Sequence, residues 1–471
     1  MQPNRRYWLI TGLLLTVLIS ACKKKDQAAG PQAPPINDSI YSVFKDIYLW
    51  TDVIPDAATF KPDNYPTVDS MFNALIHIKK NNTNGDNLDR YSFLDNGTTS
   101  RALQGGMLGD MGFEVGYQTD TTLYVIYVYP GSPADKAGIK RGWQLTSVNG
   151  VTRFLVGRAT DNMLNAAFGS SGATWIFRKP DNSTQTISLS PANYKLNPVL
   201  YANTFNFNGT KVGYFVFNNF VALADVKPTF DSLFTTYEQA GVTRLIIDLR
   251  YNGGGLLETA EYLANKLAPA SLNNSTMYTQ SFNNNVNTNN YSPLFRGMKA
   301  VPYNPGYFWT DIFRQEATTY KTTNFKKDGA LALTNLSFLV TGNTVSASEL
   351  LYNVLKPSMQ PHLIGRTTYG KPVGFINITF AQYDMYAVCF QIFNSAGEGS
   401  YFNGIPPTID TKDDYTTNWG NLNDPLLRTA LTDMGIPASQ MGRMAAPLNN
   451  TNRLAIPHPN NRFQGMIQTR R

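Results

Sequence analysis

The sequence predicts a multidomain α/β protein with a small N-terminal helical module, a domain of short strands, and a mostly parallel sheet with flanking helices. Three observations predict this class. The 471 residues are enough for two or three domains, each with its own core. Hydrophobic residues make up 42% of the chain and charged ones only 15%, which is typical of folded chains. The spacing of apolar residues also changes twice along the chain, from helical to strand-like and then to alternating strands and helices.

The first 22 residues have the pattern of a secretory signal peptide. Arg5 and Arg6 precede an apolar run at residues 8–19, which is too short for a comfortable membrane span. The following Ser20-Ala21-Cys22 resembles the lipobox of bacterial lipoproteins. That resemblance implies acylation of Cys22 and membrane anchoring in the bacterial cell envelope, on the periplasmic side or the outer surface. A plain secretory signal with a chance cysteine is the alternative.

The net charge of +7 does not indicate nucleic-acid binding. Arg5 and Arg6 belong to the signal peptide, and five further positive charges lie in Lys23–Lys25 and at Arg470 and Arg471. No other segment gathers basic residues on one helix face, as a nucleic-acid site requires. We therefore expect no nucleic-acid partner.

Histidine and cysteine usage limits the possible chemistry. The three histidines are His77, His362 and His458, and no His, Cys, Asp and Glu residues have metal-ligand spacing, so we expect no metal and no cofactor. A Ser-His-Asp triad would need His362, which begins a strand-like segment and is better explained as a half-buried structural histidine. Cys389 lies in an apolar run and is expected to be a buried free thiol, with no disulfide framework.

The N-terminal part after the signal peptide is predicted to be a tether and a helical module. Residues 23–38 contain Lys23–Lys25 and Pro34-Pro35 and are expected to be flexible. Residues 39–100 form the module, because apolar residues recur there at spacings of three and four, at Ile40, Val43, Phe44, Ile47 and Tyr48 and at Met71, Leu75 and Ile78.

Residues 101–195 have the pattern of a domain of short strands. The expected strands are 113–115, 123–129 and 144–148, with a closing hairpin at 174–177 and 184–189. Short helices are expected at 133–137 and 159–164.

Residues 200–415 alternate strands with helices, which indicates a mostly parallel sheet. Strands are expected at 212–217, 244–249 and 336–340, and helices at 226–240, 256–267 and 346–355, the last ending before Pro357. Residues 268–329 form a long polar segment, either a lid or a plain insertion. Residues 416–471 are expected to hold a C-terminal helix and a poorly ordered tail.

Ser346 stands where a buried strand and a short turn are followed by a helix. The first N–H groups of a helix lack intrahelical partners and can stabilise an oxyanion there, so a serine at this position suits a nucleophile. Ser346 and Glu349 also match a capping box, a common way to begin a helix, and this segment alone favours that structural role.

Two further segments favour catalysis. Lys371, 25 residues after Ser346, lies between glycines and apolar residues, where desolvation would lower its pKa and let the neutral amine accept a proton. An ordinary solvated turn lysine is the alternative. Asn252-Gly253-Gly254-Gly255 forms a glycine-rich turn after a strand, without the spacing of a nucleotide-binding loop. A second oxyanion donor fits this turn better.

In this order, Asp248–Leu257, Ser346–Glu349 and Gly370-Lys371 resemble the C-terminal processing (tail-specific) protease family. The resemblance implies that Ser346 is the nucleophile and Lys371 the general base. It implies backbone oxyanion donors at Ala347 and Gly254, and Glu349 as a possible assisting acid or a helix cap. Ser348 is the alternative nucleophile if the register differs. Pro372 departs from the family pattern, in which a glycine often follows the lysine, and this puts substrate preference in doubt.

The resemblance extends upstream to a PDZ domain. Asp110–Val115 resembles its carboxylate-binding loop and first strand, and Val128–Trp143 its next strand and short helix. A PDZ domain adds a peptide as an extra strand, so the resemblance implies peptide binding at Met111, Gly112, Phe113 and Glu114. Gly404-Ile405-Pro406-Pro407 matches a further family segment, and the similarity covers about residues 89–411.

The expected function is a serine endopeptidase of the C-terminal processing type. Ser346 and Lys371 would cleave exposed C-terminal tails of envelope proteins through an acyl-enzyme. The alternative is a non-catalytic, PDZ-containing lipoprotein adaptor that binds peptides. A hydrolase of non-peptide esters is a third possibility.

Overall fold

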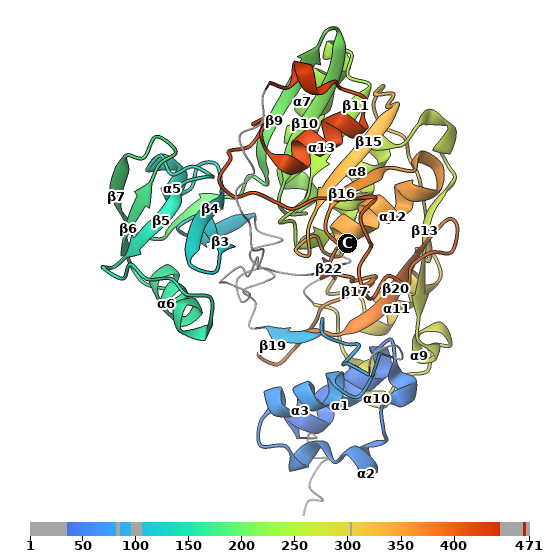
Figure 1. Cartoon of the computed structure of the whole chain (residues 1–471). Coiled ribbons are helices and arrows are strands. Elements are labelled where there is room, and N and C mark those ends of the chain that lie inside the picture. Colours follow the sequence, from blue (N-terminus) through green and yellow to red (C-terminus); the bar gives the residue numbers. More distant parts are fainter. Residues whose placement is uncertain (1–34, 82–84, 96–105, 302–303, 443–464, 468–471) are drawn as a thin grey trace, which may run out of the picture. The chain divides into compact units, whose positions relative to one another are not determined.

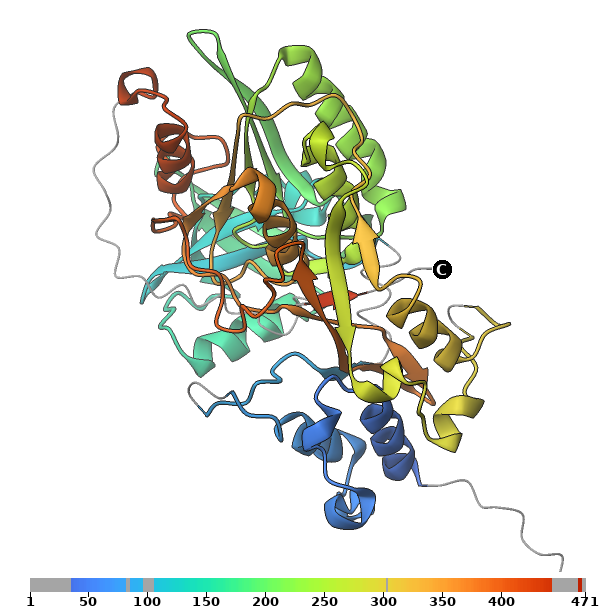
Figure 2. The same ribbon diagram turned by 90° about the vertical axis from the view of Figure 1, so that its right-hand side faces the viewer.

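The computed structural model describes residues 35–81, 85–95, 106–301, 304–442 and 465–467. The predicted signal peptide with Cys22, most of the predicted tether, and His458 lie outside these residues. Figures 1 and 2 show the chain in two orientations. Within the described part, no helix is long and apolar enough to cross a membrane.

The N-terminal module is helical, as predicted. Its apolar residues face inward, so that Ile40, Phe44 and Leu75 are fully buried. The first helix begins at Ile36, inside the predicted tether. The helical elements are α1 (Ile36–Ile47), η1 (Thr51–Val53), α2 (Ala57–Phe60), η2 (Pro62–Asn64) and α3 (Val68–Ile76).

The predicted domain of short strands folds as an antiparallel five-stranded sheet with the order β3-β4-β5-β6-β7. Its core includes Val115, Trp175 and Phe177. A separate two-stranded ladder joins β2 to β8. The elements are β2 (Met107–Asp110), β3 (Phe113–Thr119), β4 (Thr122–Val128), α5 (Pro133–Lys136), β5 (Gln144–Val148), α6 (Arg158–Phe168), β6 (Ala173–Arg178), β7 (Thr184–Leu189) and β8 (Ala192–Lys195).

A six-stranded, mostly parallel sheet follows, in the order β21-β16-β15-β11-β10-β9. Only the pairing of β9 with β10 is antiparallel. Leu245, Ile246 and Ile247 are buried on both faces of the sheet, which explains their continuous apolar run. The strands are β9 (Val199–Phe207), β10 (Thr210–Phe217), β11 (Arg244–Asp248), β15 (Asn335–Val340), β16 (His362–Gly365) and β21 (Ile409–Asp410).

Helices cover both faces of this sheet. Helix α7 lies on one face and α13 on the other (Figures 1 and 2), while α8 packs against α7 and α12. The C-terminal helix was predicted and is α13. The elements are α7 (Leu223–Ala240), α8 (Leu257–Leu267), α12 (Ala347–Met359), α13 (Pro425–Asp433) and η4 (Ala438–Gln440).

The prediction that the helix after Ser346 ends before Pro357 was wrong. Helix α12 continues through Pro357 to Met359. A proline has no N–H for the carbonyl four residues earlier, which is Asn353. That carbonyl instead accepts a hydrogen bond from Asn394 Nδ2 (3.0 Å), so the lost helical bond is replaced from outside the helix.

A second mixed sheet, in the order β12-β22-β17-β20-β13-β14, was not predicted. The prediction of a poorly ordered tail was wrong for residues 465–467, because they form strand β22. A small sheet, β1-β19-β18, pairs the N-terminal module with this region. The strands are β1 (Phe93–Asp95), β12 (Gly254–Leu256), β13 (Thr276–Phe282), β14 (Thr322–Asn324), β17 (Val373–Phe375), β18 (Ile378–Phe380), β19 (Tyr383–Tyr386), β20 (Val388–Asn394) and β22 (Gly465–Ile467).

The described residues of the long polar segment 268–329 are folded, and they dock on the N-terminal module. Asn283 Nδ2 donates to the carbonyls of Asp46 (3.0 Å) and Tyr48 (2.8 Å), and Ser292 Oγ donates to the Asp46 carboxylate (2.6 Å). Besides β13 and β14, this segment contains η3 (Ala270–Leu272), α9 (Asn284–Asn287), α10 (Pro293–Gly297) and α11 (Trp309–Ala317). It therefore fixes the helical module to the second sheet.

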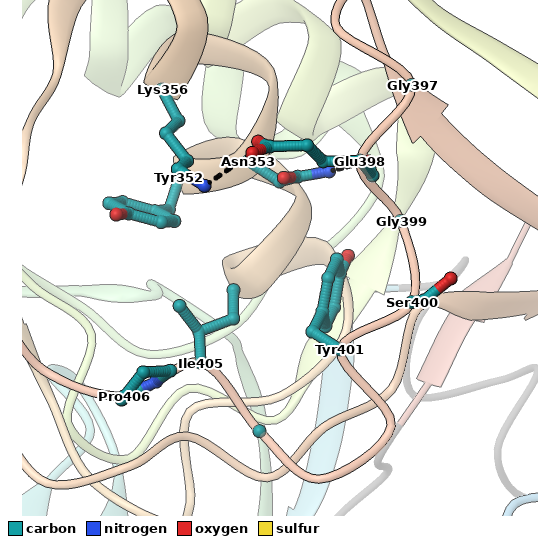
Figure 3. A pocket seen from close by; sticks show the side chains of 11 residues that line it. Tyr352, Asn353, Lys356, Gly397, Glu398, Gly399, Ser400, Tyr401, Ile405 and Pro406 are labelled. Carbon is teal, nitrogen blue, oxygen red and sulfur yellow. Dashed lines mark hydrogen bonds and ion pairs between the residues drawn. The ribbon is translucent and has the colours of Figure 1, made fainter.

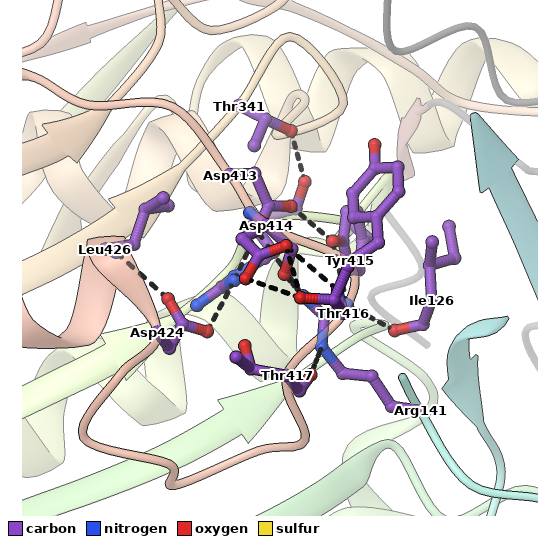
Figure 4. A network of polar contacts seen from close by, with 12 residues as sticks. Ile126, Arg141, Thr341, Asp413, Asp414, Tyr415, Thr416, Thr417, Asp424 and Leu426 are labelled. Carbon is purple, nitrogen blue, oxygen red and sulfur yellow. Dashed lines mark hydrogen bonds and ion pairs between the residues drawn. The ribbon is translucent and has the colours of Figure 1, made fainter. Parts of the chain in front are cut away.

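A buried network of charges joins the domain of short strands to the parallel sheet (Figure 4). Arg250 contacts Asp248 (2.7 Å), Asp413 (2.5 Å) and Asp424 (2.9 Å), and Arg141 also reaches Asp413 (3.4 Å). All five side chains are buried. Because Arg141 lies between α5 and β5 and Arg250 lies two residues after the end of β11, the network links the two domains through Asp413.

Candidate active site

Ser346 lies at a sharp turn between strand β15 and helix α12. Its backbone has φ +60° and ψ −107°, a left-handed conformation that costs a non-glycine residue energy and is found mainly at functional sites. The next N–H, that of Ala347, has no hydrogen-bond partner among the described residues. The turn thus presents a serine hydroxyl and an open backbone donor at the N-terminus of a 13-residue helix.

The two serines of this turn differ in their hydrogen bonding. Ser346 Oγ is fully buried and has no hydrogen-bond partner in the described part of the chain. Ser348 Oγ donates to the Asn252 carbonyl (3.2 Å), which occupies it structurally. A buried hydroxyl without a partner is costly and suggests a functional constraint. The geometry therefore favours Ser346 over Ser348 as the nucleophile.

Lys371 is fully buried, and two aromatic rings lie close to its amine. Its Nζ lies 3.7 Å from the ring centre of Phe375 and 5.4 Å from that of Tyr91. Burial lowers the pKa of Lys371 well below its ordinary value of 10.5, although Asp89 and Glu349 act in the opposite direction. This is the environment predicted for a lysine that acts as a general base, and it excludes the solvated turn lysine.

Glu349 connects the serine turn to the lysine loop. Its Oε2 accepts the backbone N–H groups of both Ser346 (2.7 Å) and Lys371 (2.9 Å), so these two backbones are close neighbours. Its Oε1 accepts the Gly370 N–H (2.7 Å) and the Thr368 hydroxyl (2.5 Å). Burial raises the pKa of Glu349, while the four donors favour its charged form. Only half of the predicted capping box is present, because Ser346 Oγ accepts no bond.

The glycine-rich turn contacts the serine turn but differs from the prediction. The Asn252 carbonyl accepts the N–H of Val345 (3.0 Å), which places the two turns side by side. The N–H of Gly254, the predicted second oxyanion donor, already donates to Asn252 Oδ1 (2.9 Å). In this conformation Gly254 is therefore not free to bind an oxyanion, and a substrate would have to displace the asparagine side chain.

The N-terminal module contributes residues to the lysine loop that were not predicted from the sequence. Tyr91 Oη donates to the Gly370 carbonyl (2.6 Å), directly before Lys371, and Arg90 Nη2 donates to the Tyr369 carbonyl (2.7 Å). Asp89 is fully buried and accepts the N–H of Tyr91 (3.0 Å). No sequence signal distinguishes these residues, which follow an Asn-rich stretch without periodicity.

A cavity of about 410 Å³ lies beside the C-terminal half of α12 (Figure 3). Tyr352 and Lys356 line it from the helix, and Tyr401 and Ile405 from the loop at residues 397–406. Lys356 Nζ forms an ion pair with Glu398 Oε1 (2.8 Å) at this cavity. Ser346 and Lys371 do not line this cavity, so the cavity is separate from the candidate dyad.

The remaining candidate groups lie elsewhere. His362 Nδ1 contacts Asp433 (2.7 Å) on α13, and its side chain is 47% exposed, so about half of the side chain is buried, as expected. Cys389 is a buried free thiol, as predicted. Among the described residues no cluster of His, Cys, Asp and Glu could hold a metal ion.

The predicted peptide-binding loop begins strand β3. Gly112 has φ +81°, and a Cβ there would lie 2.0 Å from Ser132 Cβ, so only glycine fits. The carbonyls of Met111 and Gly112 accept N–H groups of Ala134 (3.0 Å) and Tyr129 (2.8 Å). Strand β3 is at the edge of its sheet among the described strands. An edge strand can accept a further strand, as the PDZ resemblance requires.

The fold is an α/β fold in which Ser346 lies at the turn between a strand of the mostly parallel sheet and a helix. The sequence profile of peptidase family S41 matches residues 211–411, and that of the peptidase S41 N-terminal domain matches residues 35–93. The two matches together cover more than half of the chain. The chain belongs to peptidase family S41.

Similar proteins agree with this assignment. The chain is 28% identical over 268 residues to a carboxyl-terminal-processing protease of Picosynechococcus, covering 56% of this chain and 55% of the relative. It is 23% identical over 324 residues to the carboxy-terminal processing protease CtpB of Bacillus subtilis, covering 67% and 58%. The matches thus span little more than half of each relative.

A solved structure shows the same fold. The crystal structure of an S41 protease from Bacteroides fragilis superposes with a TM-score of 0.62 at 23% identity, covering 86% of this chain and 99% of that one. The comparison supports the fold, including the mostly parallel sheet predicted from the sequence.

Proposed function

We propose that this protein is a serine endopeptidase of the C-terminal processing type with Ser346 as nucleophile and Lys371 as general base. One observation carries the proposal: a single Glu349 oxygen binds the backbones of both residues, and the lysine is buried with a lowered pKa. A serine needs a nearby uncharged base to become a nucleophile, and a desolvated lysine provides one. A peptide-binding adaptor needs neither group.

The proposed reaction begins when Ser346 Oγ attacks the scissile carbonyl carbon while Lys371 Nζ accepts the hydroxyl proton. The Ala347 N–H donates to the oxyanion of the tetrahedral intermediate. When the intermediate collapses, the Lys371 ammonium gives its proton to the departing amine, leaving an ester on Ser346. Lys371 then deprotonates a water molecule, which hydrolyses the ester and regenerates the serine.

The proposed substrates are polypeptides with exposed C-terminal tails. The names of the curated relatives support this class, since they are carboxyl-terminal-processing proteases. The loop at Met111–Glu114 on edge strand β3 is proposed to bind a peptide, with Gly112 as its left-handed residue. The lipobox-like Cys22 supports a membrane-anchored lipoprotein in the cell envelope, where such tails would be the substrates.

Digestion of unfolded casein and of a peptide library by native and Ser346→Ala protein tests the proposal. We expect the native protein to cleave both and the variant to cleave neither. An absence of cleavage by native protein that still binds peptides would favour the adaptor. Cleavage of nitrophenyl esters but not of peptides would favour an ester hydrolase.

The lowered pKa of Lys371 predicts the pH dependence of the reaction. Only the neutral amine accepts a proton, so kcat/KM should rise with pH as Lys371 loses its proton and should level off well below pH 10.5. The measurement is kcat/KM for a fluorogenic peptide at pH values between 5 and 10 at which the protein remains folded. A rate that still rises tenfold per pH unit near pH 10 would contradict the assignment.

Tyr91→Phe removes one hydrogen bond to the Gly370 carbonyl and should loosen the lysine loop. We expect kcat to fall about fivefold with little change in KM, since one buried hydrogen bond contributes about 1 kcal/mol. Tyr237→Phe is a matched control, because Tyr237 Oη also donates to a backbone carbonyl, that of Tyr214 (2.9 Å), away from the dyad. Equal kcat values for the two variants would show that Tyr91 only stabilises the fold.

A further inference from the structure

Strand β22, near the end of the chain, lies between β12 and β17 and runs parallel to both. Gly465 pairs with Gly254, Met466 with Gly255, and Ile467 with Leu256. On its other side, Ile467 pairs with Phe375. Among the described strands, β22 is what connects β12 to the rest of this sheet.

Both neighbours of β22 begin at the candidate active site. Strand β12 starts at Gly254, two residues after Asn252, whose carbonyl binds the serine turn. Strand β17 starts at Val373, two residues after Lys371. Because all three strands are parallel, the N-terminal end of β22 lies at the end of the sheet where the lysine loop and the glycine-rich turn meet.

The chemistry of β22 is that of an extended, uncharged peptide. Parallel pairing uses backbone groups, which any polypeptide possesses, so this mode of binding does not depend on a particular sequence. Specificity comes from the side chain of Ile467, which is fully buried beside Leu256 and Phe375. A peptide with an aliphatic residue at this position could make the same contacts.

The site with β22 in place is closed. Ser346 and Lys371 are both fully buried, Ser346 Oγ makes no hydrogen bond to the base, and the Gly254 N–H is engaged by Asn252. In this arrangement a substrate peptide can reach Ser346 only by displacing residues that cover the Ser346 hydroxyl.

We propose that the cleft between β12 and β17 is the binding site for the substrate backbone and that the chain's own segment Gly465–Ile467 occupies it in competition with substrate. The ligand class is an extended polypeptide segment with an aliphatic side chain in the position of Ile467, bound parallel to both strands. This inference rests on the proposed peptidase function and adds its substrate-binding cleft and an intramolecular competitor.

The kinetic test uses the full chain with Ile467→Asp, which would bury a charge and so expel β22. Because a tethered competitor reduces the fraction of protein that can bind substrate, its loss should lower KM for a fluorogenic peptide about tenfold with kcat unchanged. Ile467→Val keeps the aliphatic contact and should behave like native protein. An unchanged KM, or a loss of kcat in Ile467→Asp, would overturn the inference and make β22 a structural strand.

A binding test separates this inference from the peptidase proposal. In the inactive Ser346→Ala background, a fluorescein-labelled peptide with the sequence of residues 465–471 should bind about tenfold more tightly once Ile467→Asp is added. If Ile467→Asp impairs folding, Met466→Pro removes a backbone N–H of the strand without burying a charge and should give the same result. Equal affinities with and without these changes would overturn the inference, whether or not the native protein cleaves peptides.

Discussion

Lys371→Met should lower kcat about 10⁴-fold, because the serine would lose its general base. The same change should leave the free energy of unfolding unchanged or increase it. Lys371 is fully buried and desolvation disfavours its charged form, so an apolar side chain of similar shape fits the pocket beside Phe375 at least as well. A loss of activity without a loss of stability is the signature of a catalytic lysine. Peptide hydrolysis and urea unfolding of the same preparations measure both quantities.

Lys266→Met is the control, because this change should lower the free energy of unfolding but not kcat. Lys266 is also buried, but it forms ion pairs with Asp231 (2.9 Å) and Asp328 (2.8 Å) away from the dyad. Its replacement should reduce stability and leave kcat within about twofold of native.

Combining Ser346→Ala with Lys371→Met should lower kcat little more than Ser346→Ala alone, because the two residues act as one catalytic unit. Full activity of Lys371→Met would exclude the dyad.

Asp413→Asn should cost about 3–5 kcal/mol of unfolding free energy, the largest stability effect that we predict. Asp413 is fully buried and accepts hydrogen bonds from Arg250, Arg141 and Tyr251. Burial alone would raise the pKa of Asp413, but the two guanidinium groups hold it below the ordinary 3.8. Its stabilising contribution is therefore complete above pH 3.8 and is lost only as the pH falls through the lowered pKa.

The measurement for Asp413→Asn is the urea midpoint at pH 7, with Asp135→Asn as the control. Asp135 pairs with Lys140 (3.3 Å) at the surface of the domain of short strands, and the loss of this pair should cost less than about 1 kcal/mol. The difference in unfolding free energy between the two variants measures how much more the buried network stabilises the fold than the exposed ion pair does. Similar midpoints would mean that the network does not hold the two domains together.

The order of the main elements was predictable because it depends on local spacing. The continuous apolar run Leu245-Ile246-Ile247 predicted a strand buried on both faces, and that strand is central to the parallel sheet. The position of Ser346 directly before a helix and the burial of Lys371 were predictable from a turn, a helix start and a lysine among glycines, whereas their catalytic roles stay predictions. Each of these features depends on residues that lie within a few positions of one another in the sequence.

Features that depend on distant partners were not predictable. Helix α12 passes Pro357 because Asn394, from another strand, binds the carbonyl of Asn353. Gly254 is engaged because the Asn252 side chain folds back on its N–H. Tyr91 reaches Gly370 across 279 positions of the sequence, which no local pattern records. Strand β22 pairs with β12 and β17, which both lie far from it in the sequence.

The most direct measurement of the central claim is the rate at which a fluorophosphonate probe labels Ser346 as a function of pH, with the modified residue identified by mass spectrometry. We predict labelling at Ser346 with a rate that reaches its plateau well below pH 10.5, and at least a hundredfold slower labelling in Lys371→Met. Labelling at another residue, or an equal rate in Lys371→Met, would contradict the account.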